Sequence, residues 1–380
     1  MSNTFIDPTL VARDAAIELH GSLMAAGLIP GKHDQKFASK VGQTIKVKTR
    51  PVMSANRHTG SGAFTTSDIT ESYRNLAISH RVYVKHKLTA EERTFSVDDF
   101  TLQVVRPAML ALAQDIDLWL TSNVLARGFA RYLTGTDGTE ASTLAHLAAA
   151  WQQMFDNKGL PEGKMAAGLL TSNTAANFLQ LAAFVTNAQK AGDDSTLRTG
   201  IFSPVYNMRL WPVQSASAHT RGDVAGTVLV KGGSQTGTSL IIDGLTASNG
   251  TINKGTRFTA AGDTTVYTLT ADATIASNEA TLQITPTLAA SPADNAAITF
   301  KTAFKQNVIF NPDAAAKVII APEPQWANPS SVGMFEGISI RTTFDSTLND
   351  ASTGDGDFVL FDAFIGGEVI EPKGGVIMQG

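Results

Sequence analysis

Few side chains in this sequence have the type and spacing that chemistry requires. The chain has no cysteine, which excludes disulfides, thiolate metal sites and cysteine nucleophiles. His80 and His86 share one face of an expected strand, but that separation spans about 20 Å, too far for both to bind one metal ion. We expect these histidines to lie among apolar contacts or in a subunit interface.

Other patterns that could mark an active site have simpler structural explanations. Asp115 and Asp117 are two positions apart in an expected helix, so they point in different directions and should cap or ion-pair with a neighbouring element. Residues 27–32 lack the spacing of a phosphate-binding loop, and residues 232–237 indicate a turn between β segments. The sequence therefore predicts no catalytic residue, no metal site and no cofactor, and the protein is expected not to be an enzyme.

The elements around these residues are dominated by one long alternating strand. From Leu76 to Leu88 the even positions are apolar or histidine, and the odd positions are mostly polar. Such a strand spans roughly 40 Å, and with the alternating residues 43–50 it predicts a hairpin over residues 43–88. The tip, residues 54–70, is rich in Ser, Thr, Gly and Asn and is expected to be mobile. An isolated hairpin is marginally stable, so its apolar face is expected to pack outside its own domain.

A long helix is expected to follow this strand over residues 96–127. Ser96 is its expected N-cap, Gly128 ends it, and Pro107 should kink it or split it. Capping residues and periodicity also predict helices over residues 8–29, 139–156 and 172–190, with short strands over residues 165–170, 316–321 and 358–370.

Composition divides the chain further. At 380 residues, with 43% hydrophobic and 17% charged residues, the chain is expected to hold two or three globular domains. We expect neither a signal peptide nor a membrane span. Residues 224–305 contain seventeen threonines and eight glycines but no Met, Trp or His, which predicts a small all-β domain inserted into a mixed α/β host. Carbohydrate binding by this domain is the weaker interpretation, because only four aromatic residues are available.

Charge is distributed unevenly along the chain. Residues 32–93 hold twelve Lys and Arg against five Asp and Glu, whereas residues 311–380 hold three against ten. Complementary blocks of this kind suit a protein that assembles head to tail with its own copies. Two solvated faces of unlike sign explain the pattern equally well.

Three segments resemble the major capsid proteins of tailed bacteriophages, and the coat proteins of the P-twenty-two family most of all. They are residues 71–88 (ESYRNLAISHRVYVKHKL), residues 89–100 (TAEERTFSVDDF, with Leu88 before them) and residues 106–119 (RPAMLALAQDIDLW). Residues 37–48 and the order of parts along the whole chain add to the resemblance. It implies an α+β chain with the Hong Kong 97-type capsid fold and an inserted small all-β domain.

The resemblance also implies a division of the chain. The expected parts are an N-arm (1–42), an E-loop (43–95), the spine helix of a P-domain (96–134), an A-domain (135–223 and 306–350), the β-rich insertion (224–305) and C-terminal P-domain strands (351–380).

The implied function is self-assembly into an icosahedral phage head around double-stranded DNA. Hexamers and pentamers, a separate scaffolding protein, a portal and non-specific DNA contacts are the implied partners, in a virion assembled in the host cytoplasm. A decoration or tail component and a hydrolase with an accessory β module remain the alternatives. The candidate intersubunit contacts are Lys46, Lys48, Arg50, Arg57, Arg74, Arg81, Lys85, Lys87, Asp115, Asp117, Arg341 and Asp345.

Overall fold

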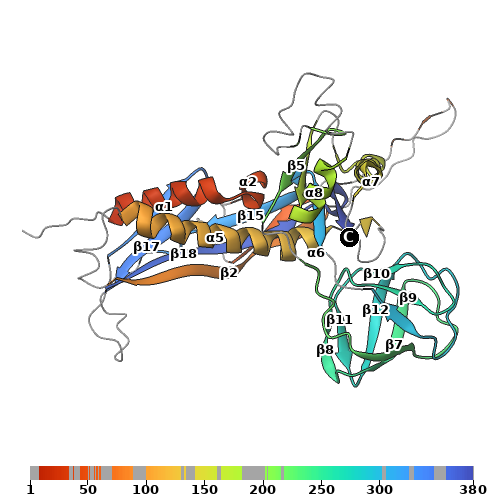
Figure 1. The fold of residues 1–380 in the computed structure, drawn as a ribbon. Helices are drawn as coiled ribbons and strands as arrows, with labels where there is room; N and C mark the ends of the chain where they lie inside the picture. The colour runs from red at the N-terminus through yellow and green to blue at the C-terminus, as the bar shows by residue number, and fades with distance from the viewer. Residues whose placement is uncertain are drawn as a thin grey trace, which may run out of the picture. The chain divides into compact units, whose positions relative to one another are not determined.

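The chain folds into two compact units, each with its own sheet (Figure 1). Unit 1 is Met1–Leu120 with Pro312–Pro372, and unit 2 is Thr121–Asn311 with Lys373–Gly380. The computed structural model describes residues 8–33, 37, 43–49, 51, 55, 57–58, 60, 71–88, 100–129, 132–133, 142–160, 164–181, 202, 204–214, 218–301, 305–324, 329–345 and 357–379.

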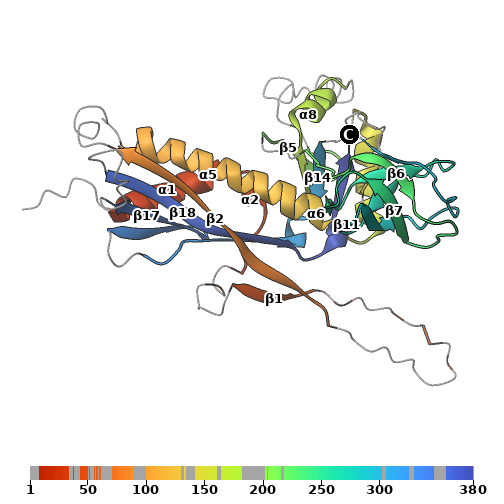
Figure 2. The ribbon, with the colours of Figure 1, turned by 90° about the horizontal axis from the view of Figure 1, so that it is seen from below.

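Unit 1 is an antiparallel sheet with helices on one face. The path of the sheet is β1-β2-β18-β17-β16, and β15 pairs with β18 as well. Its strands are β1 (Thr44–Lys48), β2 (Tyr73–Leu88), β15 (Ala315–Ile320), β16 (Ser330–Phe335), β17 (Ile338–Asp345) and β18 (Asp357–Val369). Helices α1 (Pro8–Ser22) and α5 (Arg106–Trp119) lie side by side along it (Figures 1 and 2).

Small residues allow the helices to approach the sheet closely. Ala12, Ala15 and Ala16 of α1 are fully buried. Gly333 of β16 lies directly beneath α1, where a Cβ atom would come within 1.8 Å of the Ala12 carbonyl oxygen. The predicted helix over residues 8–29 is therefore confirmed, with a break before the short helix α2 (Ala25–Leu28).

The long strand β2 is confirmed, but its apolar side chains point to one face of the sheet before a bulge and to the other face after it. His80 pairs with Ile365 and Ile78 pairs with Gly366, so Ser79 is the extra residue of a β-bulge. An extra residue reverses the alternation of side chains. Leu76 and Ile78 consequently point to the helix-free face, although the even positions beyond the bulge point toward the helices.

This arrangement corrects the prediction that residues 43–88 form a hairpin whose apolar face needs a partner outside its domain. Residues 78–88 pair with β18 in their own sheet, and only Tyr73–Ala77 pair with β1. The apolar face at the hairpin's base is already covered: Ile45, Val47 and Leu76 form one cluster with Ala316 and Val318 of β15. Burial of about 25 cal/mol per Å² of apolar surface holds this base onto unit 1.

The spine helix accommodates its proline without being split. The helical elements η1 (Thr101–Val105), α5, η2 (Leu120–Leu125) and α6 (Ala126–Gly128) follow without a break, and η1 and η2 are π-helical. Pro107 follows η1 directly. A proline ring clashes with the carbonyl four residues earlier in an ordinary α-helix, and a wider π turn at that point relieves the clash. The predicted cap at Ser96 lies outside the described residues, as does most of the predicted tip at 54–70.

Unit 2 has a smaller sheet packed by helices. Its strand order is β3-β19-β14-β4-β5, with β4 (Ala166–Leu170) buried along its whole length, as predicted. The other strands are β3 (Tyr132–Leu133), β5 (Met208–Pro212), β14 (Gln306–Phe310) and β19 (Gly375–Gln379), and the helices are α7 (Leu144–Asp156) and α8 (Ser172–Leu179). The cap of α8 is Thr171, whose Oγ1 accepts from the Thr174 amide at 3.2 Å, whereas the sequence predicts Ser172 or Asn173 as the cap.

The predicted β insertion is confirmed as eight strands around its own core (Figure 1). Phe258 and Tyr267 are fully buried in it, so these two aromatic residues serve packing. The strands are β6 (Gly226–Val230), β7 (Ser239–Leu245), β8 (Asn249–Ile252), β9 (Arg257–Ala260), β10 (Tyr267–Leu269), β11 (Ala273–Ala276), β12 (Glu279–Thr285) and β13 (Ile298–Phe300).

The two units divide the chain differently from the predicted A- and P-domains. Strands β15, β16 and β17 belong to the sheet of unit 1, so only the first part of residues 306–350 belongs with unit 2. Conversely, β19 pairs with β14 and β3 in unit 2, although residues 351–380 were expected to lie wholly with the P-domain. Hydrophobic periodicity identifies such strands but does not indicate which sheet they join.

The bulge in β2 gives a direct test of this packing. Replacing Gly366 with alanine should lower the free energy of unfolding by about 1–3 kcal/mol, since the close contact forces the backbone to shift. The added Cβ would lie 2.3 Å from the Ala77 carbonyl oxygen. Chemical denaturation followed by circular dichroism measures the change.

Gly21→Ala is the matched control. Gly21 lies in the last turn of α1 with no atom within 4 Å of an added Cβ, and alanine favours helix by up to about 1 kcal/mol. Equal stability of Gly366→Ala and the wild type would refute the close approach at the bulge.

Candidate functional site

A buried carboxylate joins three strands on the helix-free face of unit 1. Asp362 of β18 is fully buried, and Arg341 of β17 contacts it with two nitrogens, Nε at 2.9 Å and Nη2 at 2.7 Å. Arg81 of β2 donates from Nε to Asp362 Oδ2 at 2.7 Å. Arg341 also donates to the Glu323 carbonyl at 2.6 Å. Two guanidinium groups on one carboxylate satisfy its acceptors, which burial makes necessary.

This network corrects part of the predicted contact set. Arg341 has a side chain only 6% exposed and is occupied inside unit 1, so the prediction that it contacts another subunit is wrong. Arg81 retains a side chain 44% exposed while holding the same carboxylate. One feature of the sequence marks Asp362 as a residue that needs a buried partner: it is the only charged residue in the apolar run Phe358–Ile365.

Asp117 caps the start of helix α2. Its carboxylate accepts from the amides of Met24 and Ala26, both at 2.8 Å. Burial raises the pKa of Asp117, while these backbone donors and the charge of Lys317 act in the opposite direction. The predicted cap is thus confirmed, but Asp117 is buried and unsuited to an intersubunit contact, whereas Asp115 is exposed.

The remaining basic candidates lie along β1 and β2 and are here called the basic ribbon: Lys46, Lys48, Arg74 and Lys85, which are exposed, and Lys87, which is half-buried. Lys46 Nζ lies 5.0 Å from the Tyr73 ring centroid, and Lys85 Nζ lies 4.1 Å from that of Phe358. Lys48 forms an exposed ion pair with Glu71 at 2.8 Å. Arg57 is exposed as well, while Arg50 and the side chain of Asp345 lie outside the described residues. Figure 2 shows β1 and the first part of β2 extending beyond β18, while the rest of β2 lies along β18.

The two charge blocks of the sequence meet partly within unit 1. Lys32 pairs with Asp313 at 2.6 Å, and Arg81 pairs with Asp362. Each pair joins a residue of the basic block to one of the acidic block. Part of the charge asymmetry therefore stabilises the subunit itself.

Neither histidine of the long strand has a metal-binding neighbour among the described residues, where no group of three or more His, Asp or Glu could hold a metal ion. The His80 ring packs edge-on against Trp119, with centroids 5.4 Å apart. His86 is exposed. Within the part of the chain that the structure describes, no helix has the length and apolar character of a membrane span.

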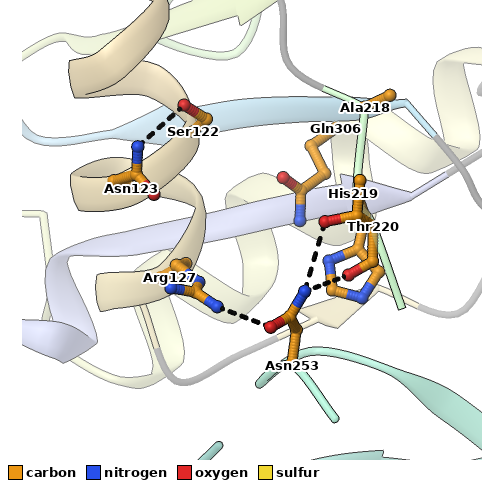
Figure 3. A pocket seen from close by; sticks show the side chains of 8 residues that line it. All are labelled: Ser122, Asn123, Arg127, Ala218, His219, Thr220, Asn253 and Gln306. Carbon is orange, nitrogen blue, oxygen red and sulfur yellow. Dashed lines mark hydrogen bonds between the residues drawn. The ribbon is translucent and has the colours of Figure 1, made fainter. Parts of the chain in front are cut away.

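A polar pocket lies in unit 2, and sequence reasoning did not find it (Figure 3). Arg127 of α6 donates to Asn253 Oδ1 and to Asp272 Oδ1, both at 3.2 Å. Asn253 in turn donates to the Thr220 carbonyl at 2.8 Å. His219 is buried beside this chain of contacts, with Nε2 3.1 Å from Thr256 Oγ1. Burial, together with the charges of Arg127, Arg257 and Arg221, lowers the pKa of His219 to about 4.

Three solved structures are similar to almost the whole chain. A chain of Mycobacterium phage Che8 is 13% identical with a TM-score of 0.52, covering 94% of this chain and 90% of that one. The capsid of cyanophage P-SCSP1u is 13% identical with a TM-score of 0.46, covering 89% and 83%. The mature capsid of bacteriophage PhiM1 is 9% identical with a TM-score of 0.45, covering 89% and 82%.

The likeness to the Che8 chain extends over both chains almost completely. The chain has the Hong Kong 97-type capsid fold. The predicted fold class is confirmed.

The insertion in this capsid fold has its own match. Residues 216–303 match the family of the B domain of the distal tail protein pb9. No curated protein matches the sequence. The match covers the predicted insertion and little else, so it describes one module of the chain.

Asp362→Asn tests the importance of the buried carboxylate in this capsid fold. Removing its charge leaves two guanidinium groups facing a neutral amide, and breaking a buried pair in this way costs about 3–5 kcal/mol. Chemical denaturation measures the loss. The matched control is Glu71→Gln, which removes the exposed partner of Lys48 and should change stability by no more than about 1 kcal/mol. Similar effects of the two variants would contradict the structural role of Asp362.

His219 predicts how the stability of unit 2 depends on pH. In the unfolded chain His219 binds a proton below about pH 6.5, but in the folded unit only below about pH 4. Protonation therefore favours the unfolded state, and stability should fall as pH drops through this window, by on the order of 2–3 kcal/mol. Thermal unfolding of the wild type and of His219→Gln between pH 7 and pH 4 measures the difference. Parallel pH profiles for the two proteins would contradict the prediction.

Proposed function

We propose that this chain is a major capsid protein of a tailed bacteriophage, which assembles with its own copies into an icosahedral shell around double-stranded DNA. The shared fold with the Che8 phage chain, over nearly the full length of both, is the observation that carries the proposal. The match of the insertion to a domain of a phage tail protein supports a phage origin independently.

The exposed parts of unit 1 suit a protein that contacts its neighbours. Four of the five residues of the basic ribbon are exposed, and Tyr73 and Tyr83 on β2 are 55% and 64% exposed. Aromatic and basic side chains on an exposed strand provide apolar contact area together with charge for an acidic partner surface. In this proposal the ribbon contacts a neighbouring subunit, and many weak contacts repeated around a closed shell add up to a stable particle.

The proposal includes partners that the fold does not specify. Hexamers and pentamers build the shell, a separate scaffolding protein directs it, a portal occupies one vertex, and packaged DNA contacts the inner surface without sequence recognition. Assembly takes place in the host cytoplasm. The tail-component alternative is less favoured, because the tail-protein match is confined to residues 216–303 while the rest of the chain has the capsid fold.

Negative-stain electron microscopy of the expressed protein tests this function. With a scaffolding protein encoded beside it, the full chain should form shells, or rings of five and six subunits. A monodisperse monomer under all conditions would overturn the proposal.

Charge reversal of the basic ribbon tests its role in the same assay. Lys85→Glu with Lys87→Glu should leave a folded subunit but reduce the yield of shells at least about tenfold, because like charges then face each other at the contact. Arg209→Glu is the control for charge reversal outside the ribbon, since Arg209 is exposed on β5 of unit 2. An unchanged yield of shells from the double variant would show that the ribbon does not form the intersubunit contact.

A further inference from the structure

The polar pocket of unit 2 has no place in the proposed shell function. It has a volume of about 300 Å³ and is built from three separate parts of the chain and one residue of β14 (Figure 3). Its described lining is Ser122, Asn123, Arg127, Ala218, His219, Thr220, Asn253 and Gln306.

The lining is rich in hydrogen-bond donors, and none of its described residues is acidic. It holds the guanidinium of Arg127, three side-chain amides (Asn123, Asn253 and Gln306), the imidazole of His219 and two hydroxyls. Figure 3 shows Arg127 and Gln306 on opposite walls of the same space. Such a set suits a ligand that accepts hydrogen bonds and carries negative charge.

The electrostatic surroundings agree with this chemistry. Among the described residues, the charges that act most on His219 are those of Arg127, Arg221 and Arg257, opposed by that of Asp272. Arg127 does contact Asp272, but at 3.2 Å, the long end for a charge-assisted bond. Three positive charges against one negative leave a local excess of positive charge, and a partly enclosed site strengthens its attraction for an anion.

We propose that this pocket binds a small oxyanion of the phosphate type, with Arg127 as its charged ligand and the Asn123 and Gln306 amides as neutral donors. The volume admits a free ion with some water but not a nucleic-acid duplex. Because Arg127 comes from α6 and Asn253 from the insertion, a bound anion would also connect the helix end to the insertion within unit 2.

Isothermal titration of the full chain with inorganic phosphate at pH 7, at ionic strength matched with chloride, tests the proposal. The wild type should bind phosphate, and thermal unfolding should shift upward with phosphate but not with chloride. Asn123→Asp should weaken binding at least about tenfold, because it places a like charge in the pocket. This variant is informative because Asn123 is exposed and its amide donates only a long bond, 3.4 Å, to the adjacent Ser122.

Arg127→Gln should abolish binding, and Arg209→Gln, outside the pocket, should bind as the wild type does. Arg127→Gln also loses the contacts to Asn253 and Asp272. If Arg127→Gln is unstable for this reason, Asn123→Asp decides the outcome. Absence of phosphate binding by the wild type, or equal binding by Asn123→Asp, would overturn the proposal. Binding of a short DNA duplex without binding of free phosphate would overturn it too. None of these outcomes depends on whether shells form.

Discussion

The close approach of two backbones at Gly366 is the constraint on which unit 1 depends. Only a residue without a side chain can lie against the Ala77 carbonyl, and this contact fixes the bulge at Ser79. The bulge lets one strand do two things. The later part of β2 pairs with β18 and packs with it against the helices. The apolar residues of the earlier part point to the opposite face, where they contact β1 and β15. Without the bulge, Leu76 would point to the wrong face of the sheet.

Charge reinforces the same strand. Arg81 follows the bulge by two residues and attaches to Asp362, which Arg341 holds from the other side. The carboxylate thus links β2 to β17 across β18, so that the register of three strands is fixed near the point where β2 changes faces. Lys85 lies further along the same strand and is exposed, which separates residues that hold the subunit together from those proposed to contact its neighbours.

Local patterns in the sequence predicted the elements well and their partners poorly. Alternation identified the strand from Leu76 to Leu88, but alternation is the same on either face, so it could not reveal that the even residues divide between two faces. The cap formed by Asp117 was predictable from its position in a helix. Arg341 was misassigned because charge composition does not show that Asp362, one charged residue in an apolar strand, requires a buried partner. The pocket around His219 brings together residues from four distant positions, and no local pattern indicates such a site.

The placement of β19 has a consequence for the order in which the protein can fold. This strand lies between β14 and β3 in the sheet of unit 2, yet it follows the strands of unit 1 along the chain. In the same way, β2 cannot pair with β18 until β18 has been synthesised. The contact between Arg81 and Asp362 joins residues 281 positions apart. On the ribosome, therefore, the sheet of unit 2 stays incomplete until unit 1 has been synthesised. Contacts so distant in sequence slow folding, and the subunit acquires its finished surfaces late in translation.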